Sequence, residues 1–263
     1  MVDRRQVLTT GLALLVLVTS EHARAELVVR IGVARDADAE LLAAAHATAL
    51  QNGVRIEPVR FADGARAGAA LAAGRVDASI AQHAPALARV RGPGGALVPV
   101  AHTVTYPTGL YSRTAARLAA LPVGATVALP ADAQELGRAL LLMHQYGLVR
   151  LDTAAGLQPG LPDIRANPRR LKFRLLAQPR LASALADHAL VALPFDAAAA
   201  AGLAPARDAI GMEDARVPFA SVLAVRAPDR EAAWVAATVR SLQSGPVKAF
   251  ILARFNDSVR RPW

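Results

Sequence analysis

The sequence predicts an α/β protein whose sheets are mostly parallel and covered by helices. Short runs rich in Val and Ile alternate with helical patterns from residue 27 onward. Three strands and two helices fit into roughly the first 60 of these residues, and glycines close both helical patterns. No repeat of fixed period and no low-complexity linker interrupts the alternation. This order of elements is typical of sheets with helices on their faces.

The first part of the chain carries the clearest alternation. We expect strands at 27–34, 54–61 and 76–81 because each is a short run enriched in β-branched residues. Helices are expected at 38–52 and 65–73, where apolar residues recur at helical spacing and a glycine follows. Together these segments predict one β-α-β-α-β unit.

The rest of the chain continues the pattern. Asp132-x-x-Glu135 resembles a capping box at the start of a helix that ends at Gly147. Segment 157–170 is rich in Pro, Gly and Asn and has no apolar period, so we expect a long surface loop. The other expected elements are strands at 126–129, 172–176, 189–193 and 219–225 and helices at 181–186, 230–242 and 246–254.

Residues 1–25 are typical of an export signal. Arg4 and Arg5 precede an apolar run at 11–18 that is too short to span a bilayer. Ala23–Ala25 has the small-x-small pattern that signal peptidase reads, so we expect cleavage near Ala25 and a periplasmic mature chain. The paired arginines also resemble a twin-arginine signal, and the export route stays open.

Composition excludes several classes of function. The chain has no cysteine, which excludes disulfides, thiolate metal sites, a thiol nucleophile and lipidation through cysteine. The net charge is +9, but the arginines are scattered among alanines and do not form blocks with interleaved aromatic residues. We therefore expect no nucleic-acid partner.

Motifs for catalysis and cofactors are missing as well. The sequence has neither a G-x-G-x-x-G nor a G-x-x-x-x-G-K segment, so nucleotide binding has no support. His46, His83, His102, His144 and His188 are not spaced as metal ligands. A Ser-His-Asp triad is assembled in space and stays open at this point, but no G-x-S-x-G elbow supports it. We expect no enzyme activity, no cofactor and no metal.

Residues 104–112 read Val-Thr-Tyr-Pro-Thr-Gly-Leu-Tyr-Ser, which resembles the Tyr-Pro-x-Gly-Leu-Tyr-Ser segment of the methionine-binding lipoprotein family of periplasmic binding proteins. Further blocks match this family in order, and the resemblance covers nearly all of residues 27–263. These blocks are 124–130, 136–142, 147–148, 167–168, 171–173, 202–203, 213–214, 243–244 and 247–250.

The resemblance implies a two-lobed periplasmic binding protein of type 2, with two crossing strands and a ligand enclosed between the lobes. One lobe would be 27–106 plus 223–263, and the other 107–222. It implies a monomer that delivers a small molecule to an ABC permease in the inner membrane. A sensing or scaffold protein on the same fold is the alternative, and the gene neighbourhood would distinguish the two. Function is argued from the site and not from the fold.

The resemblance also assigns roles to particular residues. Arg138 takes the position of the family's carboxylate-binding arginine, and a guanidinium can grip a carboxylate through two parallel hydrogen bonds. Its alternative is an exposed helical arginine paired with Glu135. His83 takes the histidine of the Gln-His-x-Pro segment and would reach the ligand from the other lobe, or else be a buried histidine at a strand end. Tyr106 could line the cleft, whereas Tyr111 is equally well a packing residue.

Several family positions are changed in this chain. Gly64, Ala81 and Ala86 stand where the family has aromatic residues around the methionine thioether, so the resemblance implies that this cage is absent. Leu193 and Ser221 stand where the family has asparagines, of which the first helps to hold the amino-acid head group. The expected ligand is an amino-acid-like solute that bears a carboxylate and is not methionine.

Overall fold

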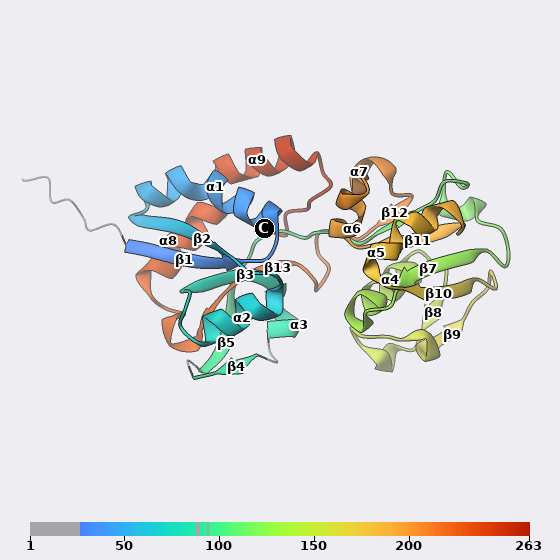
Figure 1. The fold of residues 1–263 in the computed structure, drawn as a ribbon, viewed down its shortest axis with the longest axis horizontal. Helices are drawn as coiled ribbons and strands as arrows, with labels where there is room; N and C mark the ends of the chain where they lie inside the picture. Colours follow the sequence, from blue (N-terminus) through green and yellow to red (C-terminus); the bar gives the residue numbers. More distant parts are fainter. Residues whose placement is uncertain (1–26, 88–89, 94) are drawn as a thin grey trace, which may run out of the picture.

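The computed structural model describes residues 27–87, 90–93 and 95–263, which form two α/β lobes arranged end to end (Figure 1). The first lobe contains β1 (Leu27–Val33), α1 (Asp36–Gln51), β2 (Val54–Arg60), α2 (Gly64–Ala72), β3 (Ala78–His83), α3 (Ala84–Leu87), β4 (Arg91–Gly92), β5 (Gly95–His102), β13 (Ser221–Arg226), α8 (Ala233–Leu242) and α9 (Gly245–Phe255). The second lobe contains β6 (Gly109–Tyr111), β7 (Thr126–Pro130), α4 (Ala133–Gln145), β8 (Arg150–Leu151), β9 (Ile164–Ala166), β10 (Lys172–Leu176), α5 (Gln178–Leu181), β11 (Leu190–Leu193), α6 (Phe195–Ala200), α7 (Pro205–Asp208) and β12 (Gly211–Met212).

The sheet of the first lobe has the strand order β2-β1-β3-β13-β5-β4. β1 runs parallel to β2 and β3, whereas β13 lies antiparallel between β3 and β5. Helices α1, α8 and α9 cover one face, and α2 and α3 cover the other. Ile31, Val33 and Ile80 are fully buried because the sheet is covered on both faces.

The second lobe repeats this architecture with the strand order β10-β7-β11-β6-β12. β10 and β11 run parallel to β7, and β6 is antiparallel to β11. Helix α4 packs on one face of this sheet, and α5 and α6 pack near the other. The buried face of α4 includes Leu140 and Met143, as its apolar spacing predicts.

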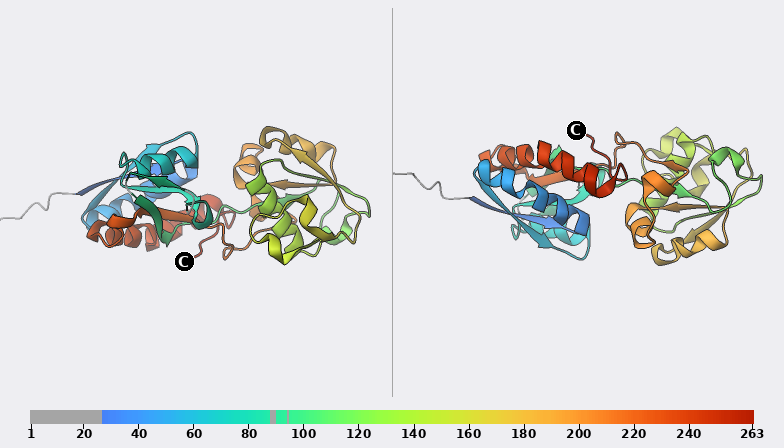
Figure 2. Two further views of the ribbon diagram at one scale, coloured as in Figure 1. Left: turned by 90° about the horizontal axis from the view of Figure 1, so that it is seen from below. Right: turned by 90° about the horizontal axis from the view of Figure 1, so that it is seen from above.

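Two segments cross between the lobes, 103–108 on the way out and 213–220 on the way back, and both views of Figure 2 show the narrow connection. Thr105 in the outgoing segment donates its hydroxyl to the carbonyl of Ala215 in the returning segment, at 3.0 Å. Its backbone also exchanges two hydrogen bonds with Arg260, of 2.8 and 3.0 Å. The C-terminal residues therefore pack against the crossing and tie it to the first lobe.

The two-lobed α/β fold predicted from the sequence is confirmed, and most strand limits agree within two residues. The prediction of a featureless loop at 157–170 was wrong, because β9 lies in it and pairs with β8. The helix expected at 181–186 is split between α5 and a 3₁₀ turn, Ser183–Ala186. β13 begins at Ser221, just before the lobe boundary expected at 223, and the exact division of the lobes stays a prediction.

The expected signal, residues 1–25, lies outside the described residues. Within the described ranges, no helix has both the length and the apolar character that crossing a bilayer requires.

Candidate ligand-binding cleft

A cavity of about 400 Å³ lies between the lobes beside the two crossing segments. The first lobe contributes the start of α2, the end of β3 and the start of β13, and the second contributes the first turns of α4. Its volume is within the range of small-molecule sites. Five of the residues predicted as ligand contacts line it: Gly64, His83, Tyr106, Arg138 and Ser221.

Arg138 lines this cavity and has three polar neighbours. Its side chain is buried on α4, and its Nε and Nη2 donate to the two carboxylate oxygens of Glu213 at 3.2 and 2.5 Å. Nη2 also donates to the carbonyl of Tyr106 at 3.0 Å. Glu135 approaches from the same helix, with its Oε1 3.8 Å from Nη1. Arg138 is therefore not the exposed helical arginine of the alternative interpretation, although Glu135 is its neighbour.

The Nη1 end of the guanidinium is the part that is left for a ligand. Among the residues that the structure describes, Nη1 makes no hydrogen bond, and the contact with Glu135 is too long to be one. A carboxylate could still accept from the two N–H groups there.

Phe219 links the site residues of the two lobes. The Arg138 guanidinium carbon lies 5.1 Å from the centre of the Phe219 ring, and the His83 ring meets the same phenyl group edge-on, with centroids 5.4 Å apart. Cations are attracted to aromatic faces at such distances. His83 and Ser221 are directly opposite each other in the β3–β13 ladder, and both are buried. The returning segment thus assembles this end of the cleft.

Tyr106 is buried on the outgoing segment and donates its hydroxyl to Asp38 Oδ1 at 2.8 Å. Burial raises the pKa of Asp38 to about 7, and the nearby Arg35 only partly offsets this rise. The Arg35 guanidinium lies 5.1 Å from the centre of the Tyr106 ring and bonds Asp196 of the second lobe at 2.9 Å. Tyr106 therefore lines the cavity, as predicted, while its hydroxyl bonds a buried acid.

The other predicted residues are placed away from the cavity or are not fully described. Leu193 is fully buried on β11 in the core of the second lobe and does not line the cavity. Tyr111 is buried in the same core, as a packing residue would be. Ala81 and Ala86 lie on β3 and α3, but their side chains are outside the described part of the structure.

Three acidic residues of the cleft were not predicted as site residues. Asp63 and Asp132 are the N-caps of α2 and α4, and their carboxylates accept backbone N–H groups of the first turn at 2.8 to 3.0 Å. Burial raises the pKa of Glu135, the third acid. The capping pattern around Asp132 was visible in the sequence, but its orientation toward the other lobe depends on the tertiary fold. No group of three His, Asp or Glu side chains in the described ranges could hold a metal ion.

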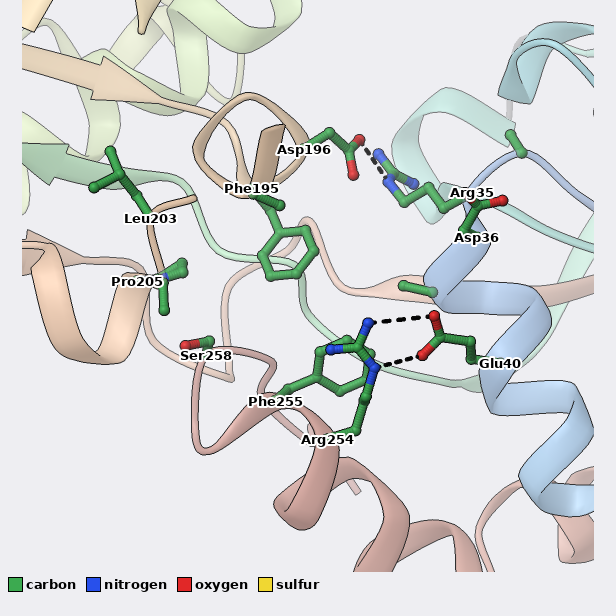
Figure 3. A pocket seen from close by; sticks show the side chains of 14 residues that line it. Arg35, Asp36, Glu40, Phe195, Asp196, Leu203, Pro205, Arg254, Phe255 and Ser258 are labelled. Atoms are coloured by element: carbon green, nitrogen blue, oxygen red, sulfur yellow. Dashed lines mark hydrogen bonds and ion pairs between the residues drawn. The ribbon is translucent and has the colours of Figure 1, made fainter. Parts of the chain in front are cut away.

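A second and larger cavity, of about 590 Å³, lies between α1 and α9 of the first lobe and α6 and α7 of the second (Figure 3). Each of its charged side chains already has an ion-pair partner, which for Asp36 is Arg60, outside the lining. Arg254 bonds Glu40 at 2.7 Å, and Arg35 bonds Asp196 at 2.9 Å. None of the predicted ligand contacts whose side chains the structure describes lines it. The smaller cavity, with the Nη1 end of Arg138, is therefore the candidate site.

Comparison with known proteins agrees with this architecture. The sequence profile of the NlpA lipoprotein family matches residues 29–263. The chain is 33% identical over 239 residues to the D-methionine-binding lipoprotein MetQ of Escherichia coli K12, covering 89% of this chain and 88% of that protein.

Solved structures give the same result. A periplasmic substrate-binding protein of an ABC transporter from Coxiella burnetii has a TM-score of 0.77 and 34% identity, covering 89% of this chain and 99% of that one. A nutrient-binding protein from Burkholderia cenocepacia, solved with methionine, also has a TM-score of 0.77, with 33% identity over 89% of this chain and all of that one. The chain belongs to the NlpA lipoprotein family, and it is a binding protein and not an enzyme.

Proposed function

We propose that this protein is an exported, periplasmic solute-binding protein that delivers a small amino-acid-like solute to an ABC permease. The observation that carries the proposal is the cavity between the lobes. The buried Arg138 lines it from the second lobe and His83 lines it from the first. The names of the relatives, among them a substrate-binding protein of an ABC transporter, support the same role. The working form would be a monomer, cleaved near Ala25.

Arg138 would orient the carboxylate of the solute. Glu213 and the carbonyl of Tyr106 fix the guanidinium, so little side-chain freedom is left to lose when a ligand binds. Lobe closure would then follow the general hinge mechanism, in which a ligand favours the closed state by contacts that exist only there. No bond is made or broken in this function.

The solute would differ from methionine. Gly64 gives the cavity no side chain where the methionine-binding family has an aromatic ring, and Leu193 is an apolar core residue where the family has an asparagine. Large aromatic side chains each bury about 150 to 250 Å² in packed sites, so their loss leaves a thioether poorly enclosed. Bulkier branched or aromatic side chains are the ones that would use this space.

Isothermal titration of ligand-stripped protein tests this specificity. We expect L- and D-methionine to bind with dissociation constants of about 1 mM or weaker. Micromolar binding of either enantiomer would show that the cleft is a methionine site in spite of its changed lining. Transport and sensing are separated by measuring the uptake of radiolabelled amino acids in a strain from which the gene for this protein is deleted. Supplying the protein again restores uptake only if it serves transport.

A further inference from the structure

The cleft has no unpaired arginine for a simple carboxylate among its described lining residues, and its acidic side chains outnumber its arginines. Both arginines of its lining are already paired, Arg138 with Glu213 and Arg35 with Asp196. The lining acids Asp63, Asp132 and Glu135 are in excess of these pairs. Among the residues that the structure describes, only Asp63 has a further cation, Arg66, at 3.6 Å. A solute that brings only negative charge would enter a lining whose arginines are already paired and in which Asp132 and Glu135 have no cation of their own among the described residues.

The two helix starts that face the cavity do not offset this excess. A helix N-terminus attracts anions through its free N–H groups. At α4, however, the Asp132 carboxylate takes the amides of Gln134 and Glu135, each at 3.0 Å. At α2, the Asp63 carboxylate takes the amide of Arg66 at 2.8 Å. Protein carboxylates thus occupy the positions that an anionic ligand would use.

Glu135 is the acid whose hydrogen bonding is incomplete. Its side chain lines the cavity and is 21% exposed, and neither of its carboxylate oxygens accepts a hydrogen bond from a described residue; only Oε2 is fully shielded from water. The contact with Arg138 Nη1, 3.8 Å, does not satisfy it. A buried carboxylate oxygen without a donor is costly, so a donor brought by a ligand would be favourable there.

We propose that Glu135 is a specificity-determining residue that accepts a hydrogen bond from a cationic nitrogen of the solute. This inference rests on the proposed function and narrows its substrate class. The solute carries an α-ammonium group within reach of Glu135 and a carboxylate on the Nη1 end of Arg138. Monocarboxylates without such a nitrogen, and dicarboxylates, are rejected. The adjacent N–H donors of Arg138 and acceptor of Glu135 match the two charges of a zwitterion.

The test compares two solutes that differ in one group. A thermal-shift screen of the common amino acids first selects the best binder, and the probes are that amino acid and the 2-hydroxy acid of the same skeleton. In the wild type we expect the amino acid to bind at least about tenfold more tightly, the effect of losing one charge-assisted hydrogen bond. In Glu135→Gln the hydroxy acid should gain affinity and the amino acid should lose affinity. The two dissociation constants should then differ by no more than about threefold.

Glu57→Gln is the matched control, because Glu57 is exposed on β2, outside the residues that line the cleft. This variant should keep the wild-type ratio. Equal binding of the two probes to the wild type, or an unchanged ratio in Glu135→Gln, would overturn the inference and leave the proposed function standing. If no amino acid of the screen binds, the amino-acid-like class itself fails, and this inference fails with it.

Discussion

At the scale of single residues, the site is built from side chains whose partners come from distant parts of the chain. Arg138 lies on α4, and Glu213, which accepts two of its hydrogen bonds, is 75 residues further on. The resemblance to a known family drew attention to Arg138 and to the block that contains Glu213. It did not indicate that the two are bonded, because no local pattern in the sequence records a contact between such separated segments.

Replacing Arg138 tests this pairing. We expect Arg138→Ala to lower the free energy of unfolding by about 3 to 5 kcal/mol, because it leaves the buried Glu213 carboxylate without its cation. The double variant Arg138→Met with Glu213→Gln should recover most of this loss. Urea denaturation measures both, and a loss below about 1 kcal/mol in the single variant would mean that the pair is not buried as described.

Asp38 gives a pH-dependent stability. Burial raises its pKa in the folded protein from 3.8 to about 7, so the folded state holds this proton to a higher pH than the unfolded chain does. The stabilisation from this group is complete below the unfolded pKa and is lost as the pH rises from about 4 to about 7. The loss is on the order of 4 kcal/mol. Glu135 shifts in the same direction.

Asp38→Asn should therefore flatten the fall in stability between pH 4 and pH 7 and raise stability at pH 8, since Asn can still accept from Tyr106. Denaturation midpoints at several pH values measure this. An unchanged pH profile in the variant would show that the Asp38 carboxyl does not titrate in this range.

At the scale of secondary-structure elements, local signals gave most of the helices and strands of both lobes. The prediction left out β5, α6 and several shorter elements. It also placed a loop at 157–170, because β9 is only three residues long and is defined by its pairing with β8 and not by its own pattern. The start of α4 carried a visible capping signal, whereas the cap of α2 at Asp63 was not predicted. Their convergence on one cavity depends on how the two lobes pack, which the spacing of residues within one helix does not determine.

The Gly-Leu-Tyr motif that forms β6 requires a glycine at position 109. A Cβ at this position would lie 2.6 Å from a ring carbon of Tyr111, which is buried in the core of the second lobe. We expect Gly109→Ala to destabilise the protein by about 1 to 3 kcal/mol, because the ring cannot move without disturbing the core. Gly245→Ala, where a Cβ meets nothing within 4 Å, is the control and should be close to neutral. Equal midpoints for the two variants would contradict this account of the motif.

At the scale of the whole molecule, the position of the site follows from the chain crossing twice between the lobes. Tyr106 and Phe219 belong to the two crossing segments, and each contacts Arg138 of the second lobe. The lobes are also joined by the Arg35–Asp196 ion pair and by the Tyr106–Phe195 ring contact, with centroids 5.0 Å apart. The alternation of strands and helices alone is compatible with one larger sheet, and the resemblance supplied the bounds of the two lobes.

Native mass spectrometry tests most directly whether the cleft at Arg138 holds the solute. Wild-type protein purified gently from its own host should retain a small-molecule adduct, because an enclosed ligand dissociates slowly. Gly64→Trp, which places a large side chain in the cavity, should lose it. Gly245→Trp, also at the first residue of a helix but facing open space, should keep it. An adduct of the same mass and occupancy on Gly64→Trp, or none on the wild type, would contradict the assignment of this cleft as the binding site.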